Sequence, residues 1–581
     1  FINEGIVLDN SIRLGSSQGH LNQDTWILAM MLSGINVLTA IYAVWVSVDL
    51  ALNDRGSQQL LNHWIKETGT QDNRLHWNGK DTLILCLILG VYSFISLNTL
   101  GSTKAPQTAW TSTDYTEKVI LDLGEVRENF VMLYFARVSR YDFSVSVSSD
   151  GENWEDETWA QMDQGQCWKW KYVTDSTPAG DGTRSYGNAR HWFSGRYVRI
   201  TAGQINLALC EVIFRDEEGL ILPVFGAERL DGDPESELYS DPGLLFDEQE
   251  SMEAMPVYFV TDASQAEGEE NPAVAQPSWW NSTYFDEIYH ARTAWEFLTG
   301  SVPYETSHPP LGKVLMSWGI ALFGMTPFGW RIAGAIAGVI MLAVIYLVAK
   351  QMTKRTGCAA FACALLALDC MHLTQTQIAT IDSFPVLFIL SAYFFMLRFL
   401  QTDWRKEKFV RVLTDLGFSG FFMGLSISSK WIGIYAGAGL AVLFFWHGIR
   451  IIRADREESM ELTAGGREKK NALHTFLKIC LWCVLFFVIV PAGTYLISYI
   501  PYFAYRHITN LSDYVQAVIN SQISMYNYHS TPGLGMDHPF YSPWYEWPVI
   551  GKPMFYSTKQ YIFNDAGNCS LPLWIRVLFS C

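Results

Sequence analysis

The stretch from Trp279 to Lys313 reads WWNSTYFDEIYHARTAWEFLTGSVPYETSHPPLGK and separates a long water-soluble region from a series of apolar segments. A helix over residues 284–298 would carry apolar side chains at three- and four-residue spacing on one face: Ile288, Ala291, Trp295 and Leu298. Its other face would carry three polar side chains: Asp286, His290 and Thr293. This pattern predicts a helix that lies on a membrane surface and holds a carboxylate just above the lipid, with tryptophans at headgroup level. The alternative is an amphipathic elbow whose charges are only solvated.

The composition outside this stretch points to a membrane protein with a large polar insert. The 581 residues are too many for one compact domain. The net charge is −17, and much of the acid lies between Asp216 and Glu270. No basic stripe predicts nucleic-acid binding. Because the chain opens with Phe1 and stops at Cys581 inside an apolar stretch, we expect it to be a fragment.

The chain before Trp279 divides into four expected segments. Residues 1–24 form a polar N-terminal segment, and residues 25–106 hold two transmembrane helices, at about 25–48 and 82–97, joined by a cytoplasmic loop. Residues 107–222 change to period-two patterns between turn residues, which is typical of an antiparallel β-sandwich. Residues 223–278 are acidic and interrupted by Pro and Gly, which predicts a solvated linker without chemistry.

The chain after the central stretch predicts a helical membrane core at 279–500, followed by an external loop and the start of a further membrane region at 501–581. Apolar segments lie at 314–324, 328–349, 357–371, 383–400, 412–428, 431–448 and 475–500, and the first is too short to cross. Alternate loops are basic, at 350–355, 398–411 and 450–470, whereas the intervening turns carry only Lys430. The positive-inside rule places the basic loops in the cytoplasm, and therefore the central stretch and the β-region outside.

Ionisable and aromatic residues that membrane structure alone does not explain then gather at the external face: Asp286, Glu287, His290, His308, Arg331, Asp369, Asp382, Lys430, His529, His538, Tyr541, Trp544 and Trp547. An interfacial carboxylate among cations suits glycosyl transfer from a lipid phosphate. A base must take the proton of the acceptor hydroxyl, and cations must balance the charge on the departing phosphate. Glycosyl transfer of this kind does not require a metal, and we expect no other cofactor.

Two resemblances sharpen this interpretation. The segments LDLGEV, SVSSDGENW, GRYVRI and EVIF within residues 108–218 resemble a discoidin (factor V/VIII C-type) domain, which implies a galactose-binding-like jelly roll that binds a glycan or lipid headgroup. A stacking platform would come from Trp154, Trp159, Trp168, Trp170, His191 and Trp192, or else several of these tryptophans belong to the core.

The second resemblance joins FDEIYH, HPPLGK, the Arg of GWRIAG, TQTQIATIDS, SSKWIGIY, MYNYH and HPFYSPWYEWP. In this order they resemble the protein O-mannosyltransferase family, in its bacterial branch with a phospholipid carrier, and imply a GT-C membrane fold. The resemblance implies that Asp286 acts as base or orients the acceptor, with Glu287 as its partner. It places Arg331 on the carrier phosphate and gives Lys313 a similar role. It further marks His308, Asp382, Lys430, His529, His538 and Trp547 as candidate site residues, and it implies no metal site.

The sequence therefore predicts a polytopic inverting glycosyltransferase in the cell membrane, with its active site on the extracytoplasmic face. Its expected partners are a polyprenyl-phosphate hexose, mannose by the resemblance, an exported protein with Ser or Thr hydroxyls, membrane lipid and a glycan at the discoidin-like domain. Two alternatives remain. One is the same donor chemistry with a lipid or cell-wall glycan acceptor, and the other is a membrane-anchored carbohydrate-binding protein without activity.

Overall fold

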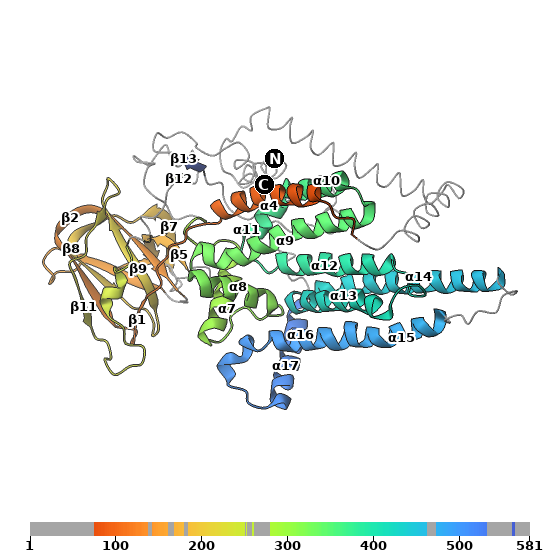
Figure 1. The fold of residues 1–581 in the computed structure, drawn as a ribbon. Coiled ribbons are helices and arrows are strands. Elements are labelled where there is room, and N and C mark those ends of the chain that lie inside the picture. The colour runs from red at the N-terminus through yellow and green to blue at the C-terminus, as the bar shows by residue number, and fades with distance from the viewer. Residues whose placement is uncertain are drawn as a thin grey trace.

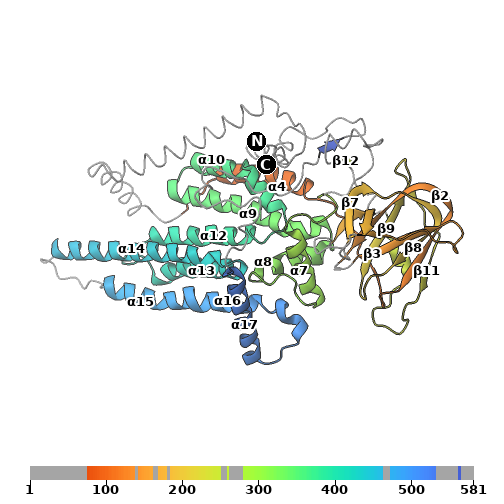
Figure 2. The same cartoon turned by 180° about the vertical axis from the view of Figure 1, so that it is seen from behind.

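The computed structural model shows a bundle of long helices with a β-sheet region at one end (Figures 1 and 2). It describes residues 75–137, 142–160, 168–178, 184–249, 251, 258–260, 279–461, 472–531 and 561–563. The expected first membrane helix at 25–48 lies outside these residues.

The described part of the chain contains six helices long and apolar enough to cross a membrane. They are α4 (Gly79–Asn98), α9 (Pro327–Thr353), α12 (Ser383–Leu400), α13 (Phe409–Ser429), α14 (Ile432–Glu461), and α15 with the segments that continue it to Ser498. The last of these runs through α15 (Ala472–Val484), the π-helical turn at Leu485–Ile489 and α16 (Val490–Ser498). The chain is therefore a polytopic α-helical membrane protein, as the hydropathy pattern predicts.

Shorter helices complete the bundle at the end that faces the β-sheet region. They are α7 (Glu287–Thr299), α8 (Leu311–Phe323), the 3-10 turn at Pro501–Arg506 and α17 (Leu511–His529). Two more, α10 (Thr356–Ala367) and α11 (Cys370–Gln377), form a pair bent by 60°. The chain between the apolar segments at 357–371 and 383–400 is not a simple turn, because α11 continues helical structure to Gln377 before Asp382 precedes α12.

The ends of the bundle differ in charge as the loop pattern predicts. The basic loops after α9, after α12 and at the end of α14 lie at the end away from the β-sheet region (Figure 1). There the buried Asp81 of α4 accepts a hydrogen bond from Tyr346 at 2.8 Å and pairs with Lys350 of α9 at 2.9 Å. A paired charge avoids the cost of an isolated ion inside the bundle. This pair therefore fixes α4 against α9.

The β-sheet region is antiparallel and organised around one long strand, β2 (Lys118–Ala136). The strand order is β1-β9-β2-β8-β3-β4, and β5, β10 and β11 pair with β2 or β9 outside this path. The bounds are β1 (Trp110–Thr111), β3 (Phe143–Ser148), β4 (Thr158–Ala160), β5 (Lys169–Tyr172), β8 (Phe193–Thr201), β9 (Ala208–Arg215), β10 (Ile221–Leu222) and β11 (Gly226–Leu230). Two small pairs add β6 (Thr174–Pro178) with β7 (Arg184–Arg190), and β12 (Tyr258–Val260) with β13 (Tyr561–Phe563).

Register shifts between Asp122 and Phe130 divide β2 into two halves. The first half pairs with β8 and β11, and the second half pairs with β9 and β5. Such irregularities bend a strand and let it serve two sheets. An apolar core that includes Trp110, Phe130 and Phe214 fills the region. This is the inserted β-structure that the period-two pattern predicts; a glycan ligand of the region remains a prediction.

The acidic segment after residue 222 is not all linker. Strand β11 pairs with β2 over five residues, and the 3-10 turn at Pro242–Leu245 buries Leu245 in the β-core. Glu248 then accepts hydrogen bonds from the backbone of Gln107 at 2.6 Å and of Thr108 at 3.0 Å. The expectation of a solvated linker is therefore wrong for residues 226–248, because their apolar and carboxylate groups complete the β-region.

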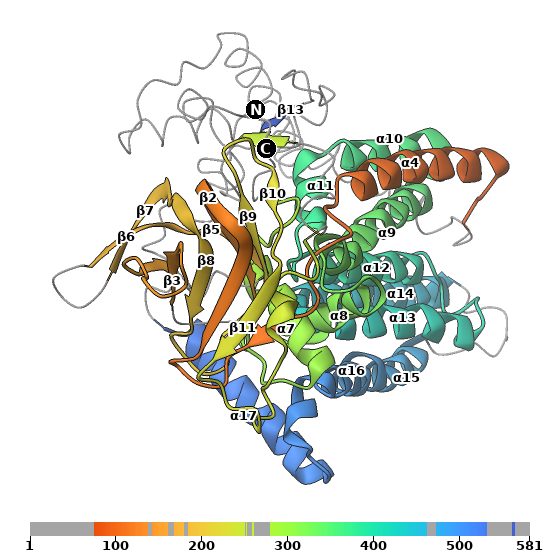
Figure 3. The ribbon, with the colours of Figure 1, turned by 90° about the vertical axis from the view of Figure 1, so that its left-hand side faces the viewer.

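The β-sheet region lies beside the helices (Figure 3), and one apolar core runs from it into them. Trp168 and Trp170 are each only 1 % exposed in this core, and the ring of Trp168 lies 5.1 Å from that of Trp295 on α7. These two tryptophans therefore do not belong to a stacking platform for glycans. The apolar face of α7 packs on the β-region and on α8, which corrects the expectation that it lies on lipid.

Candidate functional site

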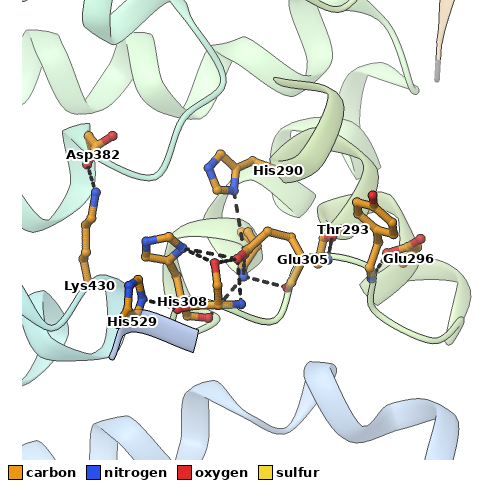
Figure 4. A network of polar contacts seen from close by, with 11 residues as sticks. His290, Thr293, Glu296, Glu305, His308, Asp382, Lys430 and His529 are labelled. Atoms are coloured by element: carbon orange, nitrogen blue, oxygen red, sulfur yellow. Dashed lines mark hydrogen bonds and ion pairs between the residues drawn. The ribbon is translucent and has the colours of Figure 1, made fainter. Parts of the chain in front are cut away.

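The candidate site lies where α7, α8, α12, α14 and α17 meet, at the end of the bundle that carries the β-sheet region (Figures 1 and 4). A pocket of about 550 Å³ opens there. It is lined by Asp286, Tyr289, His290, Tyr304, Glu305, Thr306, Ser307, His308, Ser524, Met525 and Tyr528. Its lining combines aromatic side chains with convergent polar and ionisable groups, which is the pattern of a ligand-binding site.

Asp286 reaches this pocket because the chain turns sharply in front of α7. Phe285 has a φ of 51°, a left-handed conformation that is uncommon for an aromatic residue. Asp286 follows as the N-cap of α7, but its side chain caps no backbone N–H. Burial, and then the nearby Asp382, raise the pKa of Asp286 above its usual value, while Lys430 and His308 act in the opposite direction. A carboxylate with a raised pKa suits a general base.

Glu287 turns the other way and pairs with Arg331 in the protein interior. Its carboxylate accepts hydrogen bonds from Nε and Nη2 of Arg331 at 2.7 and 2.8 Å, and from the backbone N–H of Ala379 at 3.0 Å. Arg331 also donates to the carbonyls of Leu100 at 2.9 Å and Ser282 at 3.1 Å. Glu287 is 0 % and Arg331 1 % exposed.

The structure separates Arg331 from the pocket that Asp286 lines, and the role of Arg331 on the carrier phosphate stays a prediction. Arg331 does not line the pocket, and its guanidinium already satisfies a buried carboxylate and two backbone carbonyls. A Cβ on Gly101 would lie 2.5 Å from Nη1 of Arg331, so the cage around the guanidinium is closely packed. The pair of Glu287 and Arg331 joins the segments before α7, after α4 and before α12. It therefore holds the backbone next to Asp286 in place without lining the pocket.

Lys313 is also committed to a partner inside the protein. Its ammonium group is 0 % exposed and contacts the carboxylate of Glu305 as well as the carbonyls of Glu305 at 3.1 Å and His308 at 3.2 Å. These three contacts match the three N–H donors of a lysine. The contact of Lys313 with the carrier phosphate stays a prediction, and in this structure its ammonium group has only internal partners among the contacts described.

Glu305 is the centre of the polar network in Figure 4. Its carboxylate binds Lys313, Ser307 and, at 3.2 Å, Nδ1 of His308. Burial opposes ionisation of Glu305, but Lys313 and the hydrogen bond from His308 hold its pKa well below the usual value. Residues on α7 fix the same loop, because Thr293 accepts from the N–H of Glu305 at 2.9 Å and Glu296 from that of Tyr304 at 2.7 Å.

His290 completes the wall of the pocket as a neutral group. It is 6 % exposed, and its Nδ1 lies 3.9 Å from Glu305, beyond hydrogen-bonding distance. Burial lowers the pKa of His290 to about 4, against the opposing effect of Glu305. The imidazole is therefore uncharged at neutral pH.

The remaining predicted residues within the described ranges do come together beside Asp286. Nζ of Lys430, between α13 and α14, binds Asp382 at the start of α12 at 2.5 Å, and both side chains are partly exposed. The ring of His529 on α17 lies 5.3 Å from that of His308, and its Nε2 is 2.8 Å from the carbonyl of Ser307. His538 and Trp547 lie outside the described residues.

The site contains groups that sequence reasoning missed, above all Glu305. Its position could have indicated a role, because Glu305 lies three positions before His308 in the loop that leads to α8. Among the residues that the structure describes, no three His, Cys, Asp or Glu side chains are placed to hold a metal ion.

The fold and the site define a class of protein: a polytopic membrane protein whose acid, base and cation groups converge at one end of its helical bundle. Residues 307–456 match the family model of dolichyl-phosphate-mannose-protein mannosyltransferases. The helical region of this chain is thus similar to that family.

Named relatives match about half of the chain. The polyprenol-phosphate-mannose–protein mannosyltransferase of Mycobacterium tuberculosis is 26% identical over 329 residues, which cover 49% of this chain and 59% of that protein. The enzyme of the same name from Corynebacterium glutamicum is 27% identical over 332 residues, covering 49% and 61%. The match thus spans less than two thirds of the length of these relatives.

Two solved structures share a weaker likeness. One is the S. cerevisiae protein O-mannosyltransferase Pmt1-Pmt2 complex bound to the sugar donor, with a TM-score of 0.32, 20% identity, and coverage of 38% of this chain and 30% of that chain. The other is ArnT from Cupriavidus metallidurans in the apo state, with a TM-score of 0.23, 16% identity, and coverage of 43% and 56%. Neither likeness is close enough to support an argument.

Proposed function

We propose that this protein transfers a hexose, mannose in the relatives' names, from a polyprenyl-phosphate carrier to Ser or Thr hydroxyls of exported proteins. The observation that carries this proposal is the position of Asp286. Its carboxyl lines a pocket at the polar end of a membrane bundle, caps no backbone N–H, and has a raised pKa beside Lys430 and His308. The names of the mycobacterial and corynebacterial relatives support mannose as the sugar and protein as the acceptor.

In this mechanism Asp286 accepts the proton of the acceptor hydroxyl while the oxygen attacks the anomeric carbon. The bond between that carbon and the phosphate oxygen breaks, and its electron pair leaves with the phosphate. Attack opposite the leaving group inverts the anomeric centre. Lys430 stands in the partly exposed position that a cation needs in order to balance the charge on the departing phosphate.

The active site of this proposal faces the extracytoplasmic side. The basic loops lie at the opposite end of the bundle, and positively charged loops remain in the cytoplasm. A cysteine introduced at the exposed Trp192 of the β-region reports this directly. It reacts with a membrane-impermeant maleimide in intact cells if the proposal holds, and only after lysis if it fails.

The activity is tested by incubating membranes that contain this chain with radiolabelled polyprenyl-phosphate mannose. We expect label in a protease-sensitive fraction that β-elimination releases as mannose, and no label above background with Asp286→Asn. Label in a protease-resistant glycan or lipid would replace the protein acceptor with the alternative acceptor. No transfer at all would overturn the proposal.

A glycan ligand of the β-region stays a separate proposal. Trp168 and Trp170 cannot take part, because both are buried against α7. Trp192 remains exposed at 48 %, and Trp154 carries the guanidinium of Arg199 over its ring at 4.3 Å. Loss of binding on a glycan array after Trp192→Ala would support this role, and an unchanged binding pattern would contradict it.

A further inference from the structure

Arg331 and Lys313, the two cations that the sequence predicts at the donor phosphate, both form ion pairs with buried carboxylates inside the protein. Arg331 donates hydrogen bonds to Glu287 and to two backbone carbonyls. Lys313 likewise contacts Glu305 and two backbone carbonyls. Both are at most 1 % exposed. A phosphate that bound either of them would have to displace a buried carboxylate and leave that charge without its partner, which is strongly unfavourable. The phosphate needs other partners.

His308 is held in an orientation that offers one nitrogen to a ligand. Its Nδ1 contacts Glu305 at 3.2 Å and Ser307 at 2.9 Å, so both contacts use the same side of the ring. The ring lines the pocket and is 22 % exposed at its side chain. A carboxylate next to an imidazole selects the tautomer with a proton on Nδ1. Nε2 is therefore directed away from Glu305.

Lys430 lies on that other side of the ring. Figure 4 shows His308 between Glu305 and the pair of Lys430 with Asp382, with His529 next to it. Lys430 has one carboxylate partner, and its side chain is 32 % exposed, so the ammonium group keeps donors for a ligand. Lys430 and His308 both act on the Asp286 carboxyl through their charges, which places the two bases and the acid around one space.

We propose that Nε2 of His308 and Nζ of Lys430 together bind the phosphate of a lipid-linked sugar, and that Glu305 is the positioning residue that holds His308 for this task. This inference rests on the proposed function. The donor phosphodiester carries one negative charge. When its bond to the sugar breaks, the released phosphomonoester gains a second charge that the imidazolium and the ammonium balance, while Asp286 keeps the acceptor's proton.

The test measures binding by the purified full chain in detergent, without transfer. The probes are citronellyl phosphate as a short polyprenyl phosphate, citronellol as its neutral counterpart, and inorganic phosphate. We expect His308→Gln and Lys430→Met each to weaken citronellyl phosphate at least tenfold, because a hydrogen bond to a charged group is lost. Binding of citronellol should not change. If inorganic phosphate binds as tightly as citronellyl phosphate, the lipid part of the inference falls.

The positioning role is tested by removing Glu305 while His308 and Lys430 stay in place. Glu305→Gln combined with Lys313→Met removes both buried charges together, so the pair leaves no isolated ion. This variant should bind citronellyl phosphate at least tenfold more weakly than the parent chain and citronellol equally well, because the His308 ring has lost the carboxylate that orients it.

Glu296→Gln is the matched control, since Glu296 is a buried carboxylate that holds the same loop through Tyr304 and does not contact His308. Its affinity for citronellyl phosphate should equal that of the parent. Equal affinities of the two variants, or full affinity in His308→Gln, would overturn the inference while the proposed function stands. If the parent chain binds no citronellyl phosphate but transfers mannose, the inference alone is wrong; if it does neither, both are wrong.

Discussion

Arg331 and Glu287 form a two-point ion pair inside the protein, with Nε and Nη2 of the arginine 2.7 and 2.8 Å from the two carboxylate oxygens. Glu287 follows Asp286 directly, so a residue that faces the pocket is joined to one that is anchored in the core. The pair also holds the chain at Leu100, Ser282 and Ala379. The position of Asp286 therefore depends on the ion pair between Arg331 and Glu287.

Removing one partner of this pair should destabilise the protein more than removing both. We expect Arg331→Met to lower the free energy of unfolding by about 3–5 kcal/mol, because it leaves the Glu287 carboxylate buried without its cation. The double variant with Glu287→Leu should recover part of this loss. Thermal unfolding in detergent measures both. A stable Arg331→Met protein with weakened donor binding would instead return Arg331 to the phosphate.

Asp286→Asn should abolish transfer and slightly raise the thermal stability at neutral pH. Burial raises the pKa of Asp286, so the folded state holds this proton more tightly than the unfolded chain does. The stability that comes from protonation is present at low pH and is lost as the pH rises through the folded-state pKa. Asparagine has no charge to bury at pH 7. Transfer assays and melting curves at pH 7 check the two effects.

The control for this substitution is Asp369→Asn. Asp369 is an exposed N-cap that accepts from the N–H of Met371 at 2.8 Å and does not line the pocket. Asparagine caps a helix about as well as aspartate does. We expect unchanged transfer and an unchanged melting temperature. If Asp286→Asn turned over like this control, Asp286 would have no part in the chemistry.

The sequence predicted the fold well because the dominant forces leave periodic traces. Membrane helices such as α9 and α12 need long apolar runs, and alternating basic loops show which ends of the helices lie together. That is also why Asp286, His308, Asp382 and Lys430 could be placed at one end. The β-region followed from period-two patterns. In each case the signal is local in sequence, so no partner had to be known.

The contacts within the site could not be predicted in the same way. Glu287 and Arg331 are 44 positions apart, and nothing in their local sequence shows that they neutralise each other. The spacing of apolar residues predicts that one face of α7 is buried. It does not predict whether lipid or the tryptophans of a β-sheet bury that face. The role of Glu305 depends on Lys313 and His308 folding back onto it. Charge pairing of this kind is a tertiary property.

Trp168→Ala should loosen the attachment of α7 to the β-region. The indole is 1 % exposed and packs on Trp295, and the carbonyl of Trp168 accepts a hydrogen bond from Thr283, three residues before Asp286. Truncation of a buried tryptophan costs about 3–5 kcal/mol. We expect lower thermal stability together with reduced transfer. Trp192→Ala, at an exposed position of the same region, should change neither measurement.

His290→Gln should make the stability of the protein less dependent on pH between about 5 and 6.5. Burial lowers the pKa of His290 from its usual 6.5 to about 4, so the unfolded chain binds a proton in this range that the folded protein refuses. The stability from the neutral imidazole is therefore complete above pH 6.5 and is lost as the pH falls toward 4. The full effect of such a shift is on the order of 3 kcal/mol.

The pH window separates His290 from its neighbours. Glu305 has a lowered pKa, so its contribution is also lost as the pH falls, but only below its usual value of 4.5. The contribution of Asp286 to the pH dependence of stability has the opposite sign. Because both proteins contain Asp286, this contribution cancels when the parent and His290→Gln are compared. Melting temperatures at pH 5.0, 5.8 and 6.5 in one detergent give the slopes. His76→Gln, at an exposed position before α4, should retain the slope of the parent. A His290→Gln protein with the same slope as the parent would show that His290 binds its proton equally well in the folded and unfolded states, and would contradict the prediction.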